Sequence, residues 1–296
     1  MIPANNSTAE QINESEQLLH LNESARCLLT ESLQARLTAV AEDKFILHPQ
    51  AKNILSILKR TLAKPESERP SGYVIIGPSG SGKTCIVNKL YRDLGGDRAN
   101  RVGASERIPI LVVEMPPRAT EPRVMLAMAR ALRLPVVTEN ESRKVTDIIL
   151  RKLKERHVRM VVFLELDHIK PISVQERSVV FHLIKNITNE GISIVAAGTQ
   201  TCVDLILEDE QITSRLRPLY LHGFPKDQAF VDFVATLETF YPFPKPSYLS
   251  RDHLDFIFKR TQGVAGEVVA LLNEAAAWAL RNDRKRPGGC HVGEKT

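Results

Sequence analysis

The sequence has few cysteines and no long apolar run. Its four cysteines, Cys27, Cys85, Cys202 and Cys290, lie far apart and form no CxxC pair, which argues against a zinc site or a disulfide framework. No run approaches the roughly 18 apolar residues that a membrane-spanning helix needs, so we expect no membrane partner. The first 25 residues are polar, without an apolar core of signal-peptide type, so we expect a cytoplasmic protein.

The overall composition is that of an ordinary globular protein. The 296 residues are 43% hydrophobic and 25% charged, and this length allows one large domain with a small appendage. The net charge is +5 and the pI is about 9.0, which favours attraction to a polyanion such as a nucleic acid. A solvated basic surface with no such partner is the alternative.

Short apolar strands alternate with helices through the middle of the chain. β-branched runs predict strands at Tyr73–Ile76, Ile108–Val113, Met160–Leu164, Ile192–Ala197 and Leu219–Leu221. Apolar residues recur with helical spacing between these runs, and also over residues 49–63 before the first one. Buried strands that alternate with helices predict a parallel sheet covered on both faces.

The pattern changes to helices alone from Pro225 onward, which predicts a small helical lid after the α/β domain. We expect four regions along the chain: a flexible N-terminal arm over residues 1–32, the α/β domain over 33–224, the lid over 225–283 and a tail over 284–296.

The segment after the first predicted strand matches a phosphate-binding loop in full. Its residues are Gly77-Pro78-Ser79-Gly80-Ser81-Gly82-Lys83-Thr84, with a strand before and a helix after. The glycines let backbone N–H groups point at phosphate oxygens, and the helix that begins near Gly82 adds its positive dipole end. Lys83 can reach the β- and γ-phosphates, and the Thr84 hydroxyl can ligate Mg²⁺. We therefore predict that this loop binds ATP with Mg²⁺.

The third predicted strand departs from the usual pattern of such ATPases. These proteins normally end this strand in Asp-Glu, where the Asp holds the magnesium shell and the Glu polarises water. Here Leu164 stands in the Asp position, followed by Glu165. Either Glu165 or Asp167 serves the metal instead, or the metal site is weak, and hydrolysis is therefore uncertain. If the strand continues, Glu165 and Asp167 share a face opposite Leu164. The alternative is that Asp167 and His168 only cap the end of the strand.

Two further positions are candidates for sensing bound nucleotide. Thr199 follows the fourth predicted strand, where a polar side chain could contact the γ-phosphate, and a simple helix cap is the alternative. Arg215 lies just before the last strand, where oligomeric ATPases of the AAA+ type place an arginine that reaches the neighbouring subunit's nucleotide. A surface salt bridge is the alternative for Arg215.

Several segments together resemble the TniB/TnsC group of AAA+ transposition regulators, with a more distant similarity to MuB. The segments that carry the resemblance are Gly77–Thr84, Arg159–Leu166, Ala197-Gly198-Thr199, the spacing from Gln211 to Arg215, and Gln262-Gly263 with Gly266-Glu267. The resemblance implies an AAA+ P-loop NTPase fold: an α/β domain whose parallel sheet is flanked by helices, plus a small C-terminal helical lid. Leu164 departs from the family's Asp-Glu pair, which puts ATP turnover in doubt.

The resemblance also implies a function and partners. It implies an ATP-dependent protein that binds double-stranded DNA, forms a homo-oligomeric ring or filament on target DNA, and recruits a DDE-type transposase, with a TniQ-type targeting protein as a further candidate partner. DNA contacts in the family come from loops facing the bore, and the matching region here contains Arg98, Arg101, Arg107, Arg118, Thr120 and Arg123. Arg118, Thr120 and Arg123 are the predicted DNA-binding residues, and they would contact phosphates rather than bases. A solvated basic loop is the alternative.

Two other functions compete with this interpretation. An actively hydrolysing ATPase could remodel or load DNA or a protein, although Leu164 argues against fast turnover. A nucleotide-locked interaction module without a DNA role is the third hypothesis. DNA-stimulated turnover that is lost on Glu165→Gln distinguishes the second from the first, and charge reversal of Arg118 and Arg123 distinguishes the third.

Overall fold

A computed structural model gives the fold of residues 18–65, 70–95, 107–134, 142–207 and 210–282. The chain divides into two units: an α/β unit, Pro49–His222, and a helical unit made of Met1–His48 and Gly223–Thr296. None of the described helices is both long enough and apolar enough to cross a membrane.

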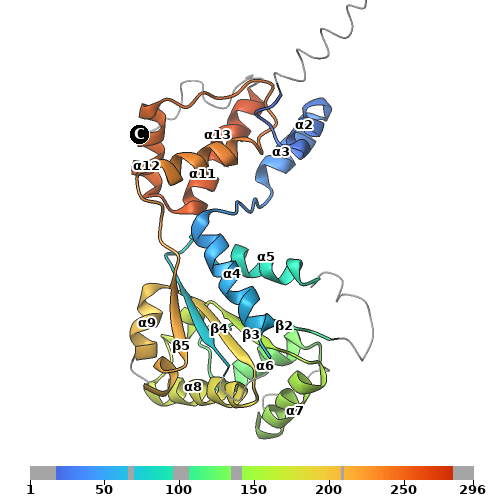
Figure 1. The fold of residues 1–296 in the computed structure, drawn as a ribbon, viewed down its shortest axis with the longest axis vertical. Helices are drawn as coiled ribbons and strands as arrows, with labels where there is room; N and C mark the ends of the chain where they lie inside the picture. Colours follow the sequence, from blue (N-terminus) through green and yellow to red (C-terminus); the bar gives the residue numbers. More distant parts are fainter. Residues whose placement is uncertain (1–17, 66–69, 96–106, 135–141, 208–209, 283–296) are drawn as a thin grey trace, which may run out of the picture. The chain divides into compact units, whose positions relative to one another are not determined.

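A five-stranded parallel sheet forms the centre of the α/β unit (Figure 1). Its strands are β1 (Gly72–Ile76), β2 (Ile110–Glu114), β3 (Met160–Leu164), β4 (Ser193–Gly198) and β5 (Leu216–Tyr220), in the spatial order β2-β3-β4-β1-β5. All neighbouring strands pair in parallel, with Ile76 of β1 opposite Gly198 of β4. The carboxyl ends of β1, β3 and β4 therefore meet at one edge of the sheet, where ligands of open α/β sheets bind.

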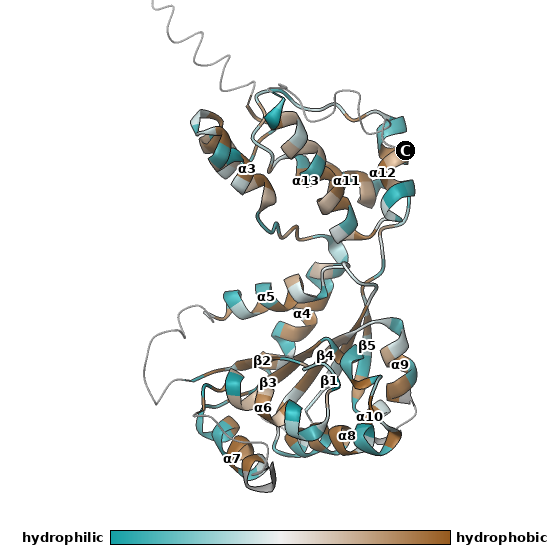
Figure 2. Cartoon of the chain, turned by 180° about the vertical axis from the view of Figure 1, so that it is seen from behind, coloured by the Kyte–Doolittle hydropathy of each residue, from teal (hydrophilic) through white to brown (hydrophobic). Residues whose placement is uncertain are grey.

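Helices cover both faces of this sheet. They are α4 (Pro49–Ala63), α5 (Lys83–Asp93), α6 (Glu121–Ala131), α7 (Ser142–Glu155), α8 (Val174–Asn189), α9 (Gln200–Leu207) and α10 (Glu210–Thr213), with a 3-10 helix, η4 (Leu166–Ile169). Figures 1 and 2 show α4 and α5 on one side of the sheet and α6, α7 and α8 on the other. Every residue of β1, β3 and β4 is buried. The two covered faces explain why these strands read as continuous apolar runs rather than alternating ones.

The predicted alternation of strands and helices is confirmed. The last strand differs, because β5 begins at Leu216 rather than at the predicted Leu219 and contains Pro218. Proline cannot donate a backbone hydrogen bond and is tolerated mainly in edge strands. Since β5 is the edge strand beside β1, Pro218 does not interrupt the sheet.

The helical unit has its own core. Its elements are α2 (Glu23–Cys27), a 3-10 helix, η1 (Leu28–Thr30), α3 (Leu33–Ala41), α11 (Gln228–Glu238), α12 (Arg251–Thr261) and α13 (Ala265–Arg281). Phe230, Phe233, Tyr241 and Phe243 are the large side chains at its centre. Local capping fixes the helix starts: the Asp227 side chain accepts a backbone hydrogen bond at the start of α11, and a Ser250–His253 capping box opens α12.

Residues before the α/β unit pack in this helical unit. Helix α3 contacts α13. The Asn22 N–H donates to the Thr239 carbonyl at 2.9 Å, and Arg36 donates to the Pro242 carbonyl at 2.7 Å. The sequence analysis assigned residues 33–48 to the α/β domain and residues 1–32 to a flexible arm. Residues 33–48 and the described part of the arm, 18–32, belong instead to the helical unit, because apolar side chains such as Val40 join its core.

Candidate nucleotide-binding site

The phosphate-binding loop joins the carboxyl end of β1 to the start of α5. Gly80 and Gly82 have left-handed backbones, with φ of 74° and 93°, which glycine adopts without strain. Gly82 is the N-cap of α5, and no side chain caps this helix. The first backbone N–H groups of α5 therefore remain available to an anion, with the positive end of the helix dipole behind them.

Close packing beneath the loop explains the first glycine. A Cβ added to Gly77 would lie 2.4 Å from the Leu221 carbonyl oxygen and 2.6 Å from Ser81 Oγ. A Cβ added to Gly82 would meet no atom within 4 Å, so Gly82 is required only for its backbone conformation. The Ser81 hydroxyl is buried and has no hydrogen-bond partner among the described residues. This buried donor is a polar group that a ligand in the loop could satisfy.

Lys83 folds back over the loop. Its Nζ donates to the carbonyl oxygens of Gly77 and Pro78, both at 2.8 Å. Burial lowers the pKa of Lys83, and the nearby charges of Glu165 and Asp167 oppose this shift. The lysine thus stands within electrostatic reach of both carboxylates predicted for the metal site, and it would exchange two carbonyls for phosphate oxygens on binding a nucleotide.

The third strand ends where the sequence departs from the usual pattern. Leu164 is the last residue of β3 and is buried. Glu165 is exposed and has a left-handed backbone, with φ of 55°, and Leu166 begins the short helix η4. Because the strand does not continue past Leu164, the condition under which Glu165 and Asp167 would share a strand face is not met. A non-glycine residue in this region is strained, and such strain concentrates at functional sites.

Asp167 instead binds the tip of β4 and its neighbours. Its carboxylate accepts hydrogen bonds from the Thr199 N–H at 2.8 Å and from the Thr199 hydroxyl at 2.5 Å. Thr201 donates to the same carboxylate at 3.4 Å, Cys202 also donates to it, and Lys170 forms an ion pair with it. Asp167 thus joins the predicted sensor residue Thr199 to the end of the third strand.

The surroundings of Asp167 shift two pKa values. Burial alone would raise the pKa of Asp167, but the hydrogen bonds from Lys170, Thr199 and Cys202 outweigh it and hold that pKa well below its usual range. Burial also raises the pKa of the Cys202 thiol to about 12, with the Asp167 charge as a second cause. Asp167 is therefore ionised, and Cys202 remains a neutral thiol that donates to it.

Sequence reasoning missed Lys170 and Cys202 as parts of this site. Each stands three residues after a predicted site residue, Asp167 and Thr199 respectively, which is one turn of helix. That spacing would have indicated both, once η4 and α9 were placed after the strand ends. Close packing also favours Gly198 here, because an added Cβ would lie 2.8 Å from Cys202 Sγ and 3.2 Å from Asp167 Oδ2.

The chemistry of the site fits a magnesium ion held mainly by phosphates. Mg²⁺ in nucleotide sites is usually bound by one or two protein oxygens, phosphate oxygens and water. Thr84, in the first turn of α5, and Glu165 are both exposed and supply such oxygens. Among the described residues, no group of three or more His, Cys, Asp or Glu side chains could hold a metal ion by itself. The ion would therefore depend on the nucleotide.

The three predicted DNA-binding residues lie close together in sequence, in the segment between β2 and α6 and in the first turn of α6. Arg118 is exposed and has a left-handed backbone, with φ of 52°, and Thr120 is the N-cap of α6. Arg123 is exposed on α6 and donates to the Pro117 carbonyl at 3.0 Å. Arg107 is exposed before the start of β2, and the other two basic residues of this region, Arg98 and Arg101, lie outside the described residues.

His168 connects this basic loop to the end of the third strand. Its Nδ1 lies 2.6 Å from the Met115 carbonyl oxygen, and its own carbonyl accepts a hydrogen bond from the Ala119 N–H at 3.1 Å. His168 directly follows Asp167 in the chain. The residue that binds Thr199 and the residue that holds the basic loop are thus neighbours on η4.

Arg215 lies at the end of the sheet where β1 and β5 begin, opposite the carboxyl ends of the strands. It precedes β5, and its carbonyl accepts a hydrogen bond from the N–H of Gly72, at the start of β1. The phosphate-binding loop follows the opposite end of β1. Within one chain, therefore, Arg215 is separated from its own phosphate-binding loop by the length of β1.

The lowered pKa of Asp167 predicts a particular dependence of stability on pH. A carboxyl group whose folded pKa is depressed contributes stability above its unfolded pKa of about 3.9, and loses it as the pH falls toward the folded pKa. Between about pH 5 and about pH 2, we expect the free energy of unfolding to fall more steeply for wild type than for Asp167→Asn. Urea denaturation followed by circular dichroism measures this difference. Asp204→Asn, at an exposed position on α9, is the control and should keep the wild-type slope; equal slopes for wild type and Asp167→Asn would contradict the prediction.

Solved structures with this fold bind DNA or nucleotides. The ORC1 protein of Aeropyrum pernix in complex with DNA is similar with a TM-score of 0.60 and 18% identity, over 84% of this chain and 65% of that one. A chain of Drosophila ORC bound to DNA has a TM-score of 0.57 and 15% identity, over 94% and 70%. The Aeropyrum pernix ORC2 protein, in ADPNP–ADP complexes, has a TM-score of 0.58 and 14% identity, over 83% and 68%. These similarities confirm the predicted α/β P-loop NTPase fold of the AAA+ type.

The motif resemblance predicted from the sequence is also confirmed at the level of the family. Comparison with curated protein sequences gives no significant match. The family model described as Bacterial TniB protein matches residues 36–226, which is more than half of the 296-residue chain. The chain therefore belongs to the bacterial TniB protein family.

Proposed function

We propose that this protein binds ATP as an assembly switch, oligomerises on double-stranded DNA as a ring or filament, and recruits a transposase of the DDE type. The observation that carries this proposal is the arrangement on η4, where Asp167 binds Thr199 and His168 holds the basic loop. One short helix thus connects a nucleotide-sensing position to a DNA-binding position. Membership of the TniB family supports the role in transposition.

In this proposal the phosphate-binding loop supplies the ATP site. The N–H groups at the start of α5 and the Lys83 ammonium bind phosphate oxygens, while Thr84 and Glu165 hold Mg²⁺ between protein and phosphates. Thr199 contacts the γ-phosphate. Its hydroxyl already donates to Asp167, so a phosphate oxygen would compete with that carboxylate for the proton. Arg215 completes the nucleotide site of the neighbouring subunit, which agrees with its distance from its own loop.

DNA binding is assigned to Arg118, Thr120 and Arg123. Both arginines are exposed, so their guanidinium groups are accessible to phosphate oxygens, the commonest partners of such side chains on DNA. Two of the solved structures with this fold are DNA complexes, which supports a DNA partner for the fold in general. A TniQ-type targeting protein is a second protein partner consistent with the family.

ATP hydrolysis in this proposal is slow. Leu164 cannot orient a magnesium-bound water, and Asp167 is held by Thr199 and paired with Lys170, so neither residue replaces the usual aspartate. An actively hydrolysing ATPase that remodels or loads DNA or protein is the second candidate. The exposed Glu165 favours that candidate, because its carboxylate lies within electrostatic reach of Lys83 and could polarise water.

The first test measures ATP binding, ATP turnover and DNA binding on the same sample. A charge-assisted hydrogen bond contributes about 1.5–3 kcal/mol, so we expect Lys83→Ala to weaken ATP binding about 10- to 100-fold. ATP-dependent DNA binding should be lost with it. Lys89→Ala, on the same helix but paired with Asp93, is the matched control and should behave as wild type. DNA binding of equal affinity without nucleotide would overturn the switch, and brisk DNA-stimulated turnover lost in Glu165→Gln would favour the second candidate.

The DNA contacts predict a change in salt dependence. The slope of log affinity against log salt concentration becomes shallower by about 0.9 for each protein contact to a phosphate of duplex DNA that is removed. Arg118→Glu with Arg123→Glu should therefore weaken DNA binding and flatten this slope by about 2. Fluorescence anisotropy with duplexes of unrelated sequence measures both quantities. Lys152→Glu, on α7, is the control; an unchanged slope in the double variant would instead favour the interaction module without a DNA role.

If the hydrogen bond between His168 and Met115 connects the two sites, removing it should weaken the coupling between ATP binding and DNA binding. We expect His168→Ala to keep its ATP affinity but to lose about 0.5–2 kcal/mol of the ATP-dependent gain in DNA affinity, because the basic loop is no longer held by η4. Titration of DNA with and without ATP measures this coupling. His182→Ala, exposed on α8, should leave it intact. Full coupling in His168→Ala would show that η4 does not connect the two sites.

A further inference from the structure

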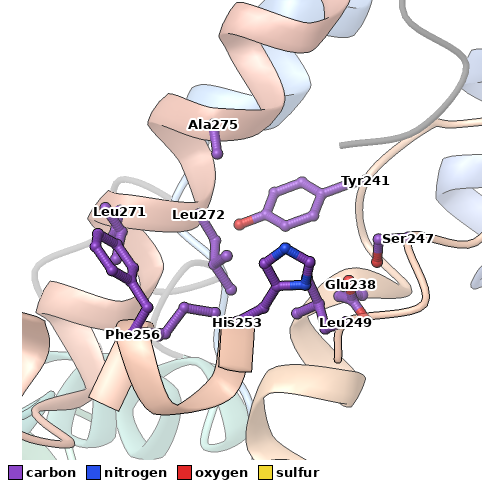
Figure 3. Close-up of a pocket in the computed structure, with 10 residues that line it drawn as sticks. Glu238, Tyr241, Ser247, Leu249, His253, Phe256, Leu271, Leu272 and Ala275 are labelled. Carbon is purple, nitrogen blue, oxygen red and sulfur yellow. The ribbon is translucent and has the colours of Figure 1, made fainter. Parts of the chain in front are cut away.

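A small pocket in the helical unit is mainly apolar and indicates no particular ligand. Residues of α11, α12, α13 and the segment 239–250 line it (Figure 3), and its walls include Leu249, Leu271 and Leu272. The hydroxyl of Tyr241, which also lines this pocket, donates to Asn273 Oδ1 at 2.8 Å. A dense cluster of polar contacts lies instead at the carboxyl edge of the sheet, around Asp167.

Lys170 belongs to this cluster and is connected to the phosphate-binding loop. It follows η4 as its C-cap residue, and its ammonium pairs with Asp167 Oδ1 and lies 3.4 Å from Thr199 Oγ1. Thr199 directly follows Gly198, whose carbonyl oxygen accepts a hydrogen bond at 3.2 Å from the N–H of Gly77, the first residue of the loop. Two hydrogen bonds and one peptide link thus join the Lys170 ammonium to the start of the loop.

Lys170 has a spare hydrogen-bond donor, whereas the Thr199 hydroxyl has none. That hydroxyl donates its single proton to Asp167 Oδ1 at 2.5 Å, so it can contact a phosphate only by giving up the carboxylate. A lysine ammonium carries three N–H donors, and the described contacts of Lys170, to Asp167 and Thr199, use two of them. The Lys170 side chain is 38% exposed, which leaves the third donor accessible to a ligand.

The departure at Leu164 increases the value of a second cation near the terminal phosphate. Magnesium normally neutralises much of the charge of a bound triphosphate, but the buried Leu164 side chain cannot orient its water shell. The hydrogen bond and the charge of Asp167 raise the pKa of Lys170, so this ammonium remains protonated at neutral pH. A lysine beside the site supplies, in addition to Lys83, positive charge that does not depend on how the metal is held.

We propose that Lys170 binds the terminal phosphate of a nucleoside triphosphate, and that Asp167 and Thr199 position its ammonium for this contact. This assignment rests on the proposed ATP site and names the residue that distinguishes a triphosphate from a diphosphate there. The N–H groups at the start of α5 bind phosphates that ATP and ADP share, whereas Lys170 contacts only the group that ADP lacks. A surface ion pair that merely stabilises η4 would leave the preference for ATP over ADP unchanged.

The first experiment measures nucleotide affinity by calorimetry on the full chain with Mg²⁺. It compares ADP with ADPNP, a triphosphate analogue that resists hydrolysis. Lys170→Met keeps the aliphatic stem without the charge, and we expect about 10- to 100-fold weaker binding of ADPNP, with ADP affinity changed by no more than about twofold. Lys170→Arg keeps the charge and should retain most of the preference for ADPNP. Lys154→Met, which also removes a lysine from a surface ion pair, with Glu190, is the matched control and should behave as wild type.

Lysine footprinting tests the contact directly. The folded wild-type chain is treated with an amine-acetylating reagent, and the extent of reaction at each lysine is read by mass spectrometry. ADPNP should protect Lys170 several-fold more than ADP does, because only the triphosphate engages its ammonium. Lys154 in the same sample should react equally with either nucleotide. Equal protection of Lys170 by ADP and ADPNP would contradict the contact.

Three results of the affinity measurements would overturn the proposal. Equal weakening of ADPNP and ADP binding in Lys170→Met would give the lysine a purely structural role. An unchanged ratio of the two affinities would show that another group reads the terminal phosphate. An unchanged ratio together with a shallower salt dependence of DNA binding would make a DNA phosphate the ligand of Lys170. Each of these results leaves the ATP site standing, whereas no nucleotide binding by wild type would overturn the proposed function and this assignment together.

Discussion

The carboxylate of Asp167 holds together the edge of the sheet on which the proposed function depends. It accepts both the backbone N–H and the hydroxyl of Thr199, and so fixes the end of β4 beside the end of β3. Because β4 also pairs with β1, the same contact positions Thr199 next to the strand that leads into the phosphate-binding loop. The pKa of Asp167 is depressed because the bond from Lys170, these two bonds from Thr199 and the bond from Cys202 outweigh burial, so the group stays charged near neutral pH.

This use of Asp167 changes what the site can do with a nucleotide. A carboxylate that already accepts from Thr199 and pairs with Lys170 has little capacity left for a metal-bound water. The position that would normally hold that water is Leu164, which is buried in the core. In the proposed function, the site keeps groups that would bind and sense ATP, while Glu165 is the one predicted site residue among those described that is left to organise its hydrolysis. This favours a protein that responds to nucleotide rather than one that consumes it rapidly.

The sequence alone predicted the sheet, its helices and the phosphate-binding loop, because these depend on local periodicity and on one specific motif. It could not predict that β3 ends at Leu164, since the left-handed backbone of Glu165 depends on η4 packing beneath it. Cys202 was missed because it donates to Asp167 at the end of another strand, far away in sequence. Lys170 stands only three residues after Asp167, and it was missed because the short helix η4 was not predicted. The placement of residues 33–48 in the helical unit likewise depends on long-range packing against α13.

Backbone strain supports the same interpretation of the site. Glu165 and Arg118 both have left-handed backbones, although neither is glycine, and each lies at the carboxyl edge of the sheet. Such conformations cost about 1–3 kcal/mol and persist only where surrounding contacts enforce them. His168 supplies those contacts on both sides, because its N–H donates to the Glu165 carbonyl while its ring and carbonyl hold the segment around Arg118. His168 therefore contacts both strained segments, so a rearrangement at one of them can reach the other through this residue, as the proposed coupling between nucleotide and DNA requires.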